Sequence, residues 1–206
     1  MKIVEPSVEL IDSIKPAEIL AKIERCGRVS HQSAPRPLHT YGAVNRSEDF
    51  IRKIIKRGHE SVLEHVSLTF HIICDRAIMA ELTRHRHASF TVESTRYVKH
   101  DELTVVLYTK DILTQAFIEN GVIRAERSYG DLCRGDATPE EARTVLPLCL
   151  KSELYMTANL RELRHILKLR TSKAAHPQMR FIAGQILNIL RDKLPVIVED
   201  IKEVES

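Results

Sequence analysis

The feature of this sequence that most constrains its fold is a change of hydrophobic period around residue 66. From Val66 to Ile72 every second residue is apolar, which is the pattern of a β-strand that packs one face on a core. In the segments 17–26 and 159–170, apolar residues recur instead at helical spacing. Helices and strands therefore mix along the chain, and we expect an α+β fold with a central, mostly antiparallel sheet flanked by helices. The length of 206 residues predicts a single domain, residues 1–206.

Periodicity and end signals predict the remaining elements. Ser47, Thr138 and Asn159 are good N-cap residues, and Pro139 suits the first position of a helix. Residues 30–45 contain two prolines and a glycine, which predict a loop. Further helices are expected at 17–26, 47–58, 77–82, 112–129, 138–146 and 177–193, and further strands at 103–108 and 148–157.

Composition restricts the class of protein. With 43% hydrophobic and 29% charged residues, the chain has the balance of a soluble globular protein and is too apolar to stay disordered. The N-terminus, MKIVEPSVELIDSIKP, carries acids and prolines where a signal peptide needs an uninterrupted apolar stretch. No later run approaches the ~20 apolar residues of a membrane span, so we expect a cytoplasmic protein. The cysteines are scattered without a C-x-x-C pair, and we expect all four to be reduced core residues: Cys26, Cys74, Cys133 and Cys149.

One segment, from Arg84 to Arg96, concentrates positive charge. It contains three arginines and two histidines against the single acid Glu93, although the whole chain carries only +3. Arginine forks and the hydroxyls of this segment suit phosphate oxygens, because charge-assisted, bidentate hydrogen bonds match that geometry. Two other interpretations stay open, a solvated basic loop and a nucleic-acid-binding module. With 5% aromatic residues and no Trp, base stacking would not be the main mode of such a module.

A further cation, Arg170, falls on an apolar helix face. It lies in register with Leu163, Ile166 and Leu167 at the spacing i, i+3, i+4 and i+7. A cation in that position is expected to need an anionic partner. The neighbouring polar residues of the same helix could form a plain solvated face: Arg161, Arg164, His165 and Lys168.

Several polar residues have simple structural interpretations. The segment HESVLEH, residues 59–65, lacks the H-E-x-x-H spacing of zinc enzymes, so its histidines predict a hydrogen-bonding scaffold and no metal site. Asn159 could act only as a helix cap, and Arg143 could complement a helix end. Glu81 could be an exposed helix residue. Ser94 has no base at a recognisable spacing, so we expect it to bind substrate and not to act as a nucleophile.

Several sequence blocks together identify a family. Arg84-His85-Arg86 is followed after seven residues by Ser94, and Arg96-Tyr97 continue the pattern. Three longer blocks occur in order with it: GHESVLEH at 58–65, ARTVLP at 142–147 and TANLRELRHILKLRTSKAAHPQMR at 157–180. In this combination the sequence resembles the flavin-dependent thymidylate synthases over nearly the whole chain.

The resemblance implies an enzyme, a methyltransferase of dTMP biosynthesis. Such enzymes transfer a one-carbon unit from methylenetetrahydrofolate to dUMP, with bound FAD supplying hydride and NADPH as the expected reductant. The family assembles as a homotetramer whose active sites lie between subunits, so an oligomeric active site is implied. Neither nucleic acid nor a membrane is an implied partner.

The resemblance also implies roles for individual residues. Arg170 is expected to be catalytic, because an arginine held on an apolar stripe can stabilise negative charge on the pyrimidine and activate its carbon 5. Cofactor contacts are expected at Ser61, Arg84, His85, Arg86, His87, Val92, Asn159, Leu160, Arg161 and His165. Substrate contacts are expected at Glu81, Leu82, Thr83, Arg84, Val92, Glu93, Ser94, Thr95, Arg96, Arg143 and Arg170.

Three positions depart from the family pattern. Glu81 stands where Gln is common, Val92 where a polar residue is usual, and His165 where Asn is common. The Val92 side chain cannot hydrogen-bond a nucleotide, and an acid at position 81 near an anionic nucleotide must bond ribose or a cation. The acceptor therefore stays open, because relatives of this family methylate UMP or hydroxymethylate dUMP.

Overall fold

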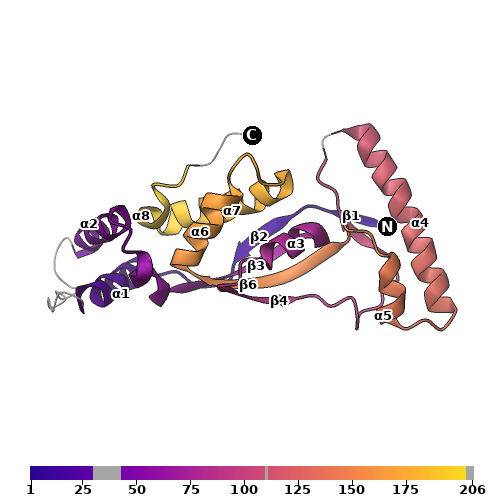
Figure 1. Ribbon diagram of the computed structural model, residues 1–206, viewed down its shortest axis with the longest axis horizontal. Coiled ribbons are helices and arrows are strands. Elements are labelled where there is room, and N and C mark those ends of the chain that lie inside the picture. Colours follow the sequence, from indigo (N-terminus) through magenta and orange to yellow (C-terminus); the bar gives the residue numbers. More distant parts are fainter. Residues whose placement is uncertain (30–42, 110, 203–206) are drawn as a thin grey trace. The chain divides into compact units, whose positions relative to one another are not determined.

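The computed structural model describes residues 1–29, 43–109 and 111–202 (Figure 1). Its four-stranded sheet has the strand order β2-β3-β6-β4, and β1 and β5 form a separate pair. The predicted α+β class, with an antiparallel sheet flanked by helices, is confirmed. The elements follow one another in the order β1 (Lys2–Val4), β2 (Ser7–Leu10), α1 (Pro16–Arg28), α2 (Ala43–Lys56), η2 (Glu60–His65), β3 (Ser67–Asp75), α3 (Arg76–Leu82), β4 (Ala88–Val92), β5 (Thr104–Val106), α4 (Ile112–Arg134), α5 (Pro139–Ala142), η3 (Arg143–Val145), β6 (Lys151–Asn159), α6 (Leu160–Arg170), α7 (Pro177–Lys193) and α8 (Pro195–Val198).

The chain divides into two compact units. Unit 1 comprises Met1–Val8, His71–Arg84 and Phe90–Tyr155, and unit 2 comprises Glu9–Phe70, His85–Ser89 and Met156–Ser206. The long strands β3 and β6 each run from one unit into the other. The expectation of a single domain stays a prediction.

Unit 1 is organised around a small apolar core. Strand β1 pairs in parallel with β5, with Lys2 opposite Thr104. The N-terminal ammonium is held by the carboxylates of Glu102, at 2.8 Å, and Glu126, at 3.2 Å. The sequence predicted β5 but not β1. The fully buried residues of this core are Leu103, Val105, Val122 and Leu150.

The helices of unit 1 begin at side-chain caps. Asp111 caps α4 by accepting a hydrogen bond from Thr114 N at 2.8 Å, and α4 continues through Gly121, where the sequence suggested a weak point. Thr138 begins α5 with a capping box, because Thr138 Oγ1 accepts from Glu141 N and the Glu141 carboxylate accepts from Thr138 N. The predicted helix start at Thr138 is therefore confirmed, although only four residues are α-helical before η3.

Unit 2 is mainly helical. Helix α1 packs against α2 and η2, while α6 packs against η2, α7 and α8 (Figure 1). Helix α2 ends in a Schellman motif: Gly58 has a positive φ of 71°, and the N–H groups of Gly58 and His59 donate to the carbonyls of Ile55 and Ile54. The chain then enters η2, which carries the segment predicted as a scaffold.

The predicted start of α2 at Ser47 is wrong. The helix is described from Ala43, so the last residues of the predicted loop are helical, and residues 30–42 of that loop lie outside the described residues. Ser47 is buried inside the helix, where its hydroxyl donates to Glu24 Oε2 at 2.5 Å. A residue with good capping chemistry is used here to satisfy a buried carboxylate.

Strand β3 confirms the period-two pattern, because Val66, Leu68, Phe70 and Ile72 are all buried. On the neighbouring strand β6, Thr157 bonds Thr69 at 3.0 Å through their hydroxyls. Strand β6 begins at Lys151, three residues later than predicted, and ends at Asn159, two residues later than predicted. The predicted helices at 77–82 and 177–193 are confirmed as α3 and α7.

Among the described residues, no helix combines the length and apolarity needed to cross a membrane. All four cysteines are free thiols. Only Cys74 is fully buried, and burial raises its pKa to about 12.

Candidate functional site

Unit 2 contains a cavity of about 560 Å³ that is lined almost entirely by polar side chains. Its volume lies within the range of small-molecule sites. Four of its lining residues were expected to contact the cofactor: His87, Asn159, Arg161 and His165. The other four were not predicted as site residues: Glu60, Glu64, Glu162 and Lys168.

Helix α6 supplies most of this lining. Asn159 ends β6 and caps α6, accepting a hydrogen bond from Glu162 N at 2.9 Å. From this cap, Glu162, His165 and Lys168 follow at three-residue intervals, which places them along one side of the helix. The predicted apolar stripe is confirmed on the core side, since its three apolar members are buried: Leu163, Ile166 and Leu167.

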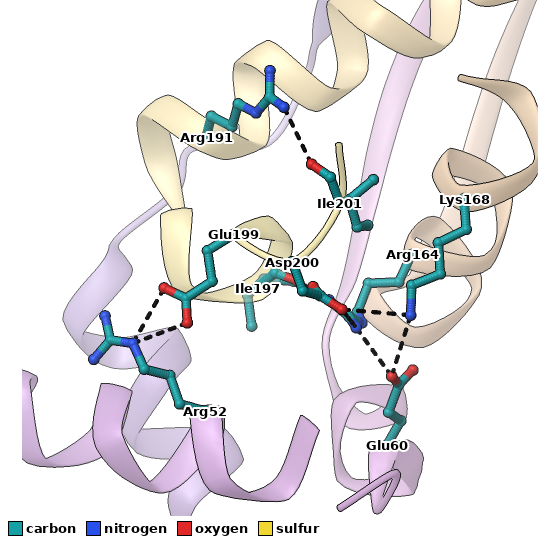
Figure 2. Close-up of polar contacts among 9 residues, drawn as sticks. All are labelled: Arg52, Glu60, Arg164, Lys168, Arg191, Ile197, Glu199, Asp200 and Ile201. Atoms are coloured by element: carbon teal, nitrogen blue, oxygen red, sulfur yellow. Dashed lines mark hydrogen bonds and ion pairs between the residues drawn. The ribbon is translucent and has the colours of Figure 1, made fainter. Parts of the chain in front are cut away.

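Arg164 pairs with Glu60 of the cavity wall and is almost completely buried, with 1% of its side chain exposed. Its Nη1 and Nη2 atoms bind the Asp200 carboxylate in a bidentate pair at 2.7 and 2.8 Å (Figure 2). Nη2 also donates to Glu60 Oε1 at 3.1 Å, and Nη1 donates to the Ile197 carbonyl. The interpretation of Arg164 as part of a solvated face is therefore wrong. No local sequence pattern indicates this burial, because both anionic partners come from distant segments.

Two of the three acids of the cavity wall, Glu60 and Glu64, are paired with cations, whereas Glu162 faces His85. Glu60 bonds Arg164 and lies 3.8 Å from Lys168 Nζ (Figure 2). Glu64 pairs with Arg161, and both residues line the cavity. The wall therefore carries charges of both signs, and it can donate and accept hydrogen bonds. Among the described residues, no cluster of three His, Cys, Asp or Glu side chains could hold a metal ion.

His85 is the buried member of the basic segment in unit 2, with 6% of it exposed. Its Nε2 accepts a hydrogen bond from Arg170 Nε at 3.0 Å, and its Nδ1 faces Glu162 Oε1 at 3.5 Å. The His165 ring lies edge-on to it, with 6.0 Å between ring centroids. Burial, followed by the charges of Arg170 and His165, lowers the pKa of His85 to about 4. One partner of the catalytic candidate Arg170 is thus a neutral imidazole.

The remaining cofactor candidates of unit 2 come from three segments of the chain. Arg86 and His87 are exposed in the turn that precedes β4. Ser61 is exposed on η2, next to Glu60 of the cavity wall. Leu160 is buried, and its backbone N–H donates to the Val66 carbonyl at 2.9 Å, which fixes the start of α6.

The substrate candidates of unit 1 lie at residues 81–84, at residues 92–96 and at Arg143. Glu81 and Leu82 end α3, and Thr83 and Arg84 form the following turn, in which Arg84 is exposed. Arg143 is exposed at the start of η3. The side chain of Glu81 is partly buried, so the interpretation as a fully exposed helix residue is wrong.

The stretch from Val92 to Arg96 is ordered by neighbours within unit 1. Val92 ends β4, and Glu93 N donates to the Glu153 carbonyl at 2.8 Å. The Glu93 carboxylate lies 3.1 Å from Lys151 Nζ. Ser94 Oγ accepts from Arg96 N at 3.3 Å, Thr95 is buried, and Arg96 Nε donates to Glu140 Oε1 at 2.5 Å. The basic segment from Arg84 to Arg96 therefore contains strand β4 and is not a plain solvated loop.

A family model described as "Thymidylate synthase complementing protein" matches residues 9–196 of this chain. A probable flavin-dependent thymidylate synthase of Mycobacterium phage L5 is 36% identical over 201 residues, covering 88% of this chain and 80% of the relative. The flavin-dependent thymidylate synthase of Mycobacteroides abscessus is 32% identical, covering 87% of this chain and 78% of the relative.

Solved structures share the fold. The UMP/dUMP methylase PolB of Streptomyces cacaoi, bound with 5-Br dUMP, superposes with a TM-score of 0.83 at 24% identity and full coverage of both chains. The same methylase bound with 5-Br UMP gives a TM-score of 0.79, covering 97% of this chain and 95% of the other. At this identity the likeness concerns the fold.

Proposed function

This chain belongs to the thymidylate synthase complementing protein family, and we propose that it converts dUMP to dTMP as a flavin-dependent methyltransferase. The observation that carries this conclusion is the family match over residues 9–196. The cavity of unit 2 supports it independently, because four side chains expected at the flavin line that one cavity.

The residues of the cavity fit a flavin dinucleotide. FAD carries an anionic pyrophosphate and a ring whose edge both donates and accepts hydrogen bonds. Arg161 and Lys168 offer cationic donors, and Asn159, His87 and His165 offer groups that can donate or accept. We propose that these residues hold FAD, together with Ser61, Arg84, His85, Arg86, Val92 and Leu160.

When bound, the reduced flavin supplies the hydride that completes the methyl group. The protein's own contribution is to bind and polarise the nucleotide. Arg170 stabilises the negative charge that develops on the pyrimidine carbonyl and ring nitrogen, which activates carbon 5 without a nucleophilic cysteine. The exposed guanidinium groups of Arg84 and Arg143 suit the phosphate of dUMP.

Further partners belong to the same proposal. Methylenetetrahydrofolate is the one-carbon donor, and NADPH is the reductant. The chain acts in the cytoplasm as a homotetramer, so that several copies of the chain contribute residues to each active site. The substrate set comprises Glu81, Leu82, Thr83, Arg84, Val92, Glu93, Ser94, Thr95, Arg96, Arg143 and Arg170.

A second candidate function is favoured by one observation. The solved structures with this fold include a methylase described for both UMP and dUMP. Val92 and Glu81 occupy expected substrate positions with side chains that differ from the family pattern. We therefore keep UMP methylation and dUMP hydroxymethylation as the alternative reactions.

The test begins with the absorbance spectrum of the purified protein, before and after addition of FAD. We expect flavin to co-purify with the protein and to show its absorbance spectrum. We also expect the protein to turn over dUMP with methylenetetrahydrofolate and NADPH. Parallel assays with UMP and analysis of the product decide the acceptor, and activity on UMP alone would overturn the choice of dUMP. A colourless protein that binds polynucleotide with steep salt dependence would support the nucleic-acid-binding module instead.

A further inference from the structure

The contact between His85 and Arg170 determines the protonation of the imidazole. A guanidinium has five N–H donors and no acceptor, so Arg170 must donate in this hydrogen bond. His85 Nε2 is the acceptor, at 3.0 Å from Arg170 Nε, and therefore carries no proton. The single proton of a neutral imidazole then resides on Nδ1, the atom that faces Glu162 Oε1 at 3.5 Å.

The surroundings of His85 favour this neutral form. Its ring is buried, and three charged or titratable groups of α6 lie next to it: Glu162, His165 and Arg170. A proton on Nε2 would place two donors against each other at 3.0 Å in a buried site, so the Arg170 contact would break. The carboxylate of Glu162 in turn favours the proton on Nδ1, as an acidic partner commonly selects a histidine tautomer.

We propose that His85 is the positioning residue of Arg170, acting as a neutral acceptor whose tautomer Glu162 selects. Glu162 lies in the first turn of α6 and Arg170 in the last, and the His85 ring connects them along the helix. The hydrogen bond at Nε fixes the plane of the Arg170 guanidinium, and hence the directions of its Nη donors. This inference rests on the proposed role of Arg170 at the pyrimidine.

The first test is the tautomer itself, which is independent of turnover. Nitrogen NMR of ¹⁵N-histidine-labelled protein, compared with the spectrum of His85→Gln, identifies the His85 signals. We expect a protonated Nδ1 and an unprotonated Nε2 between pH 7 and pH 5. In Arg170→Ala the pKa of His85 should rise, because one cause of its lowering is removed. Lys173→Ala, which removes an exposed cation three residues further along, should leave that pKa unchanged.

The second test separates positioning from flavin binding. His85→Leu, assayed with saturating added FAD, should lower kcat for dUMP by about 100-fold, the scale expected for a misplaced catalytic group, and this loss should exceed any loss of bound flavin per chain. His85→Gln can place an amide oxygen near the position of Nε2, so it should recover most of the lost rate. Thermal unfolding of both variants reports whether they fold.

Each adverse outcome is distinct. If the wild-type protein binds no flavin or does not turn over a pyrimidine nucleotide, the proposed function is refuted. The tautomer of His85 can still be measured in that case, because it does not depend on turnover. A proton on Nε2, an unchanged kcat in His85→Leu, or a rate loss that only matches lost flavin would overturn the positioning role while the function survives.

Discussion

The buried guanidinium of Arg164 should be the most stabilising single charge in unit 2. Arg164→Met keeps most of the apolar stem and removes every hydrogen bond to Asp200, Glu60 and the Ile197 carbonyl. Removing one partner of a buried ion pair costs about 3–5 kcal/mol, because the remaining charge is left unpaired. The Asp200 side chain is 42% exposed and lies 3.6 Å from Lys168 Nζ, so water and this ammonium recover part of the loss. We therefore expect the free energy of unfolding to fall by about 3 kcal/mol.

The matched control is Arg52, which pairs with Glu199, the residue next to Asp200 in the sequence. Arg52 Nε contacts both carboxylate oxygens of Glu199 at 3.0 and 3.2 Å, yet the two side chains are 43% and 46% exposed (Figure 2). Exposed pairs of this kind contribute about 0–1 kcal/mol. Arg52→Met also removes exposed contacts to Glu48 and Asp49, and it should lower the free energy of unfolding much less than Arg164→Met does.

Urea denaturation followed by far-UV circular dichroism measures both variants. The free energies are extrapolated linearly to water, at one protein concentration, because an oligomer's stability depends on concentration. A difference of less than about 1 kcal/mol between Arg164→Met and Arg52→Met would refute the reasoning, because burial would then not decide the strength of the pair.

Three further predictions concern other groups. The pKa of His85 is about 4 in the folded protein and 6.5 when exposed, so between these pH values the imidazole binds a proton only in the unfolded chain. The free energy of unfolding should therefore fall by up to roughly 3 kcal/mol from pH 6.5 to pH 4. His85→Gln should lack this pH-dependent component. Cys74, with a pKa of about 12, should resist alkylation at pH 8 that modifies partly exposed Cys26, as mass spectrometry of peptides can show. Thr138→Ala should cost about 1 kcal/mol in urea denaturation through loss of the capping box, whereas Thr144→Ala, which removes no N-cap, should cost less.

Elements with strong local signals could be predicted from the sequence. Helix α7 has the predicted bounds, and the alternation after Val66 became β3, because periodicity and end signals act over a few residues. The short strands β1 and β4 were missed for a physical reason. Three residues of β1 gain their stability from pairing with β5 about a hundred positions away, and such pairing leaves little trace in local sequence.

The site residues stay a prediction, and the charge pairing around the cavity could not be predicted from the sequence. Four residues expected at the flavin do line one cavity, because the cap at Asn159 fixes the phase of α6. The acids Glu60 and Glu64 and the buried state of Arg164 depend on contacts between η2, α6 and the chain beyond α8. No periodicity encodes which distant carboxylate will meet a guanidinium.

His85, the middle residue of the R-H-R segment, shows why a motif can combine exposed cations with a buried neutral side chain. Arg84 and Arg86 are exposed, whereas His85 between them is buried against Arg170. An arginine or lysine at position 85 would bring a second cation to within hydrogen-bonding distance of Arg170 in a site with little water, where like charges repel most strongly. A neutral imidazole avoids this repulsion and still offers an acceptor. The alternation of guanidinium, imidazole and guanidinium therefore follows from burial, since outward positions can bind anions while the inward position must stay uncharged.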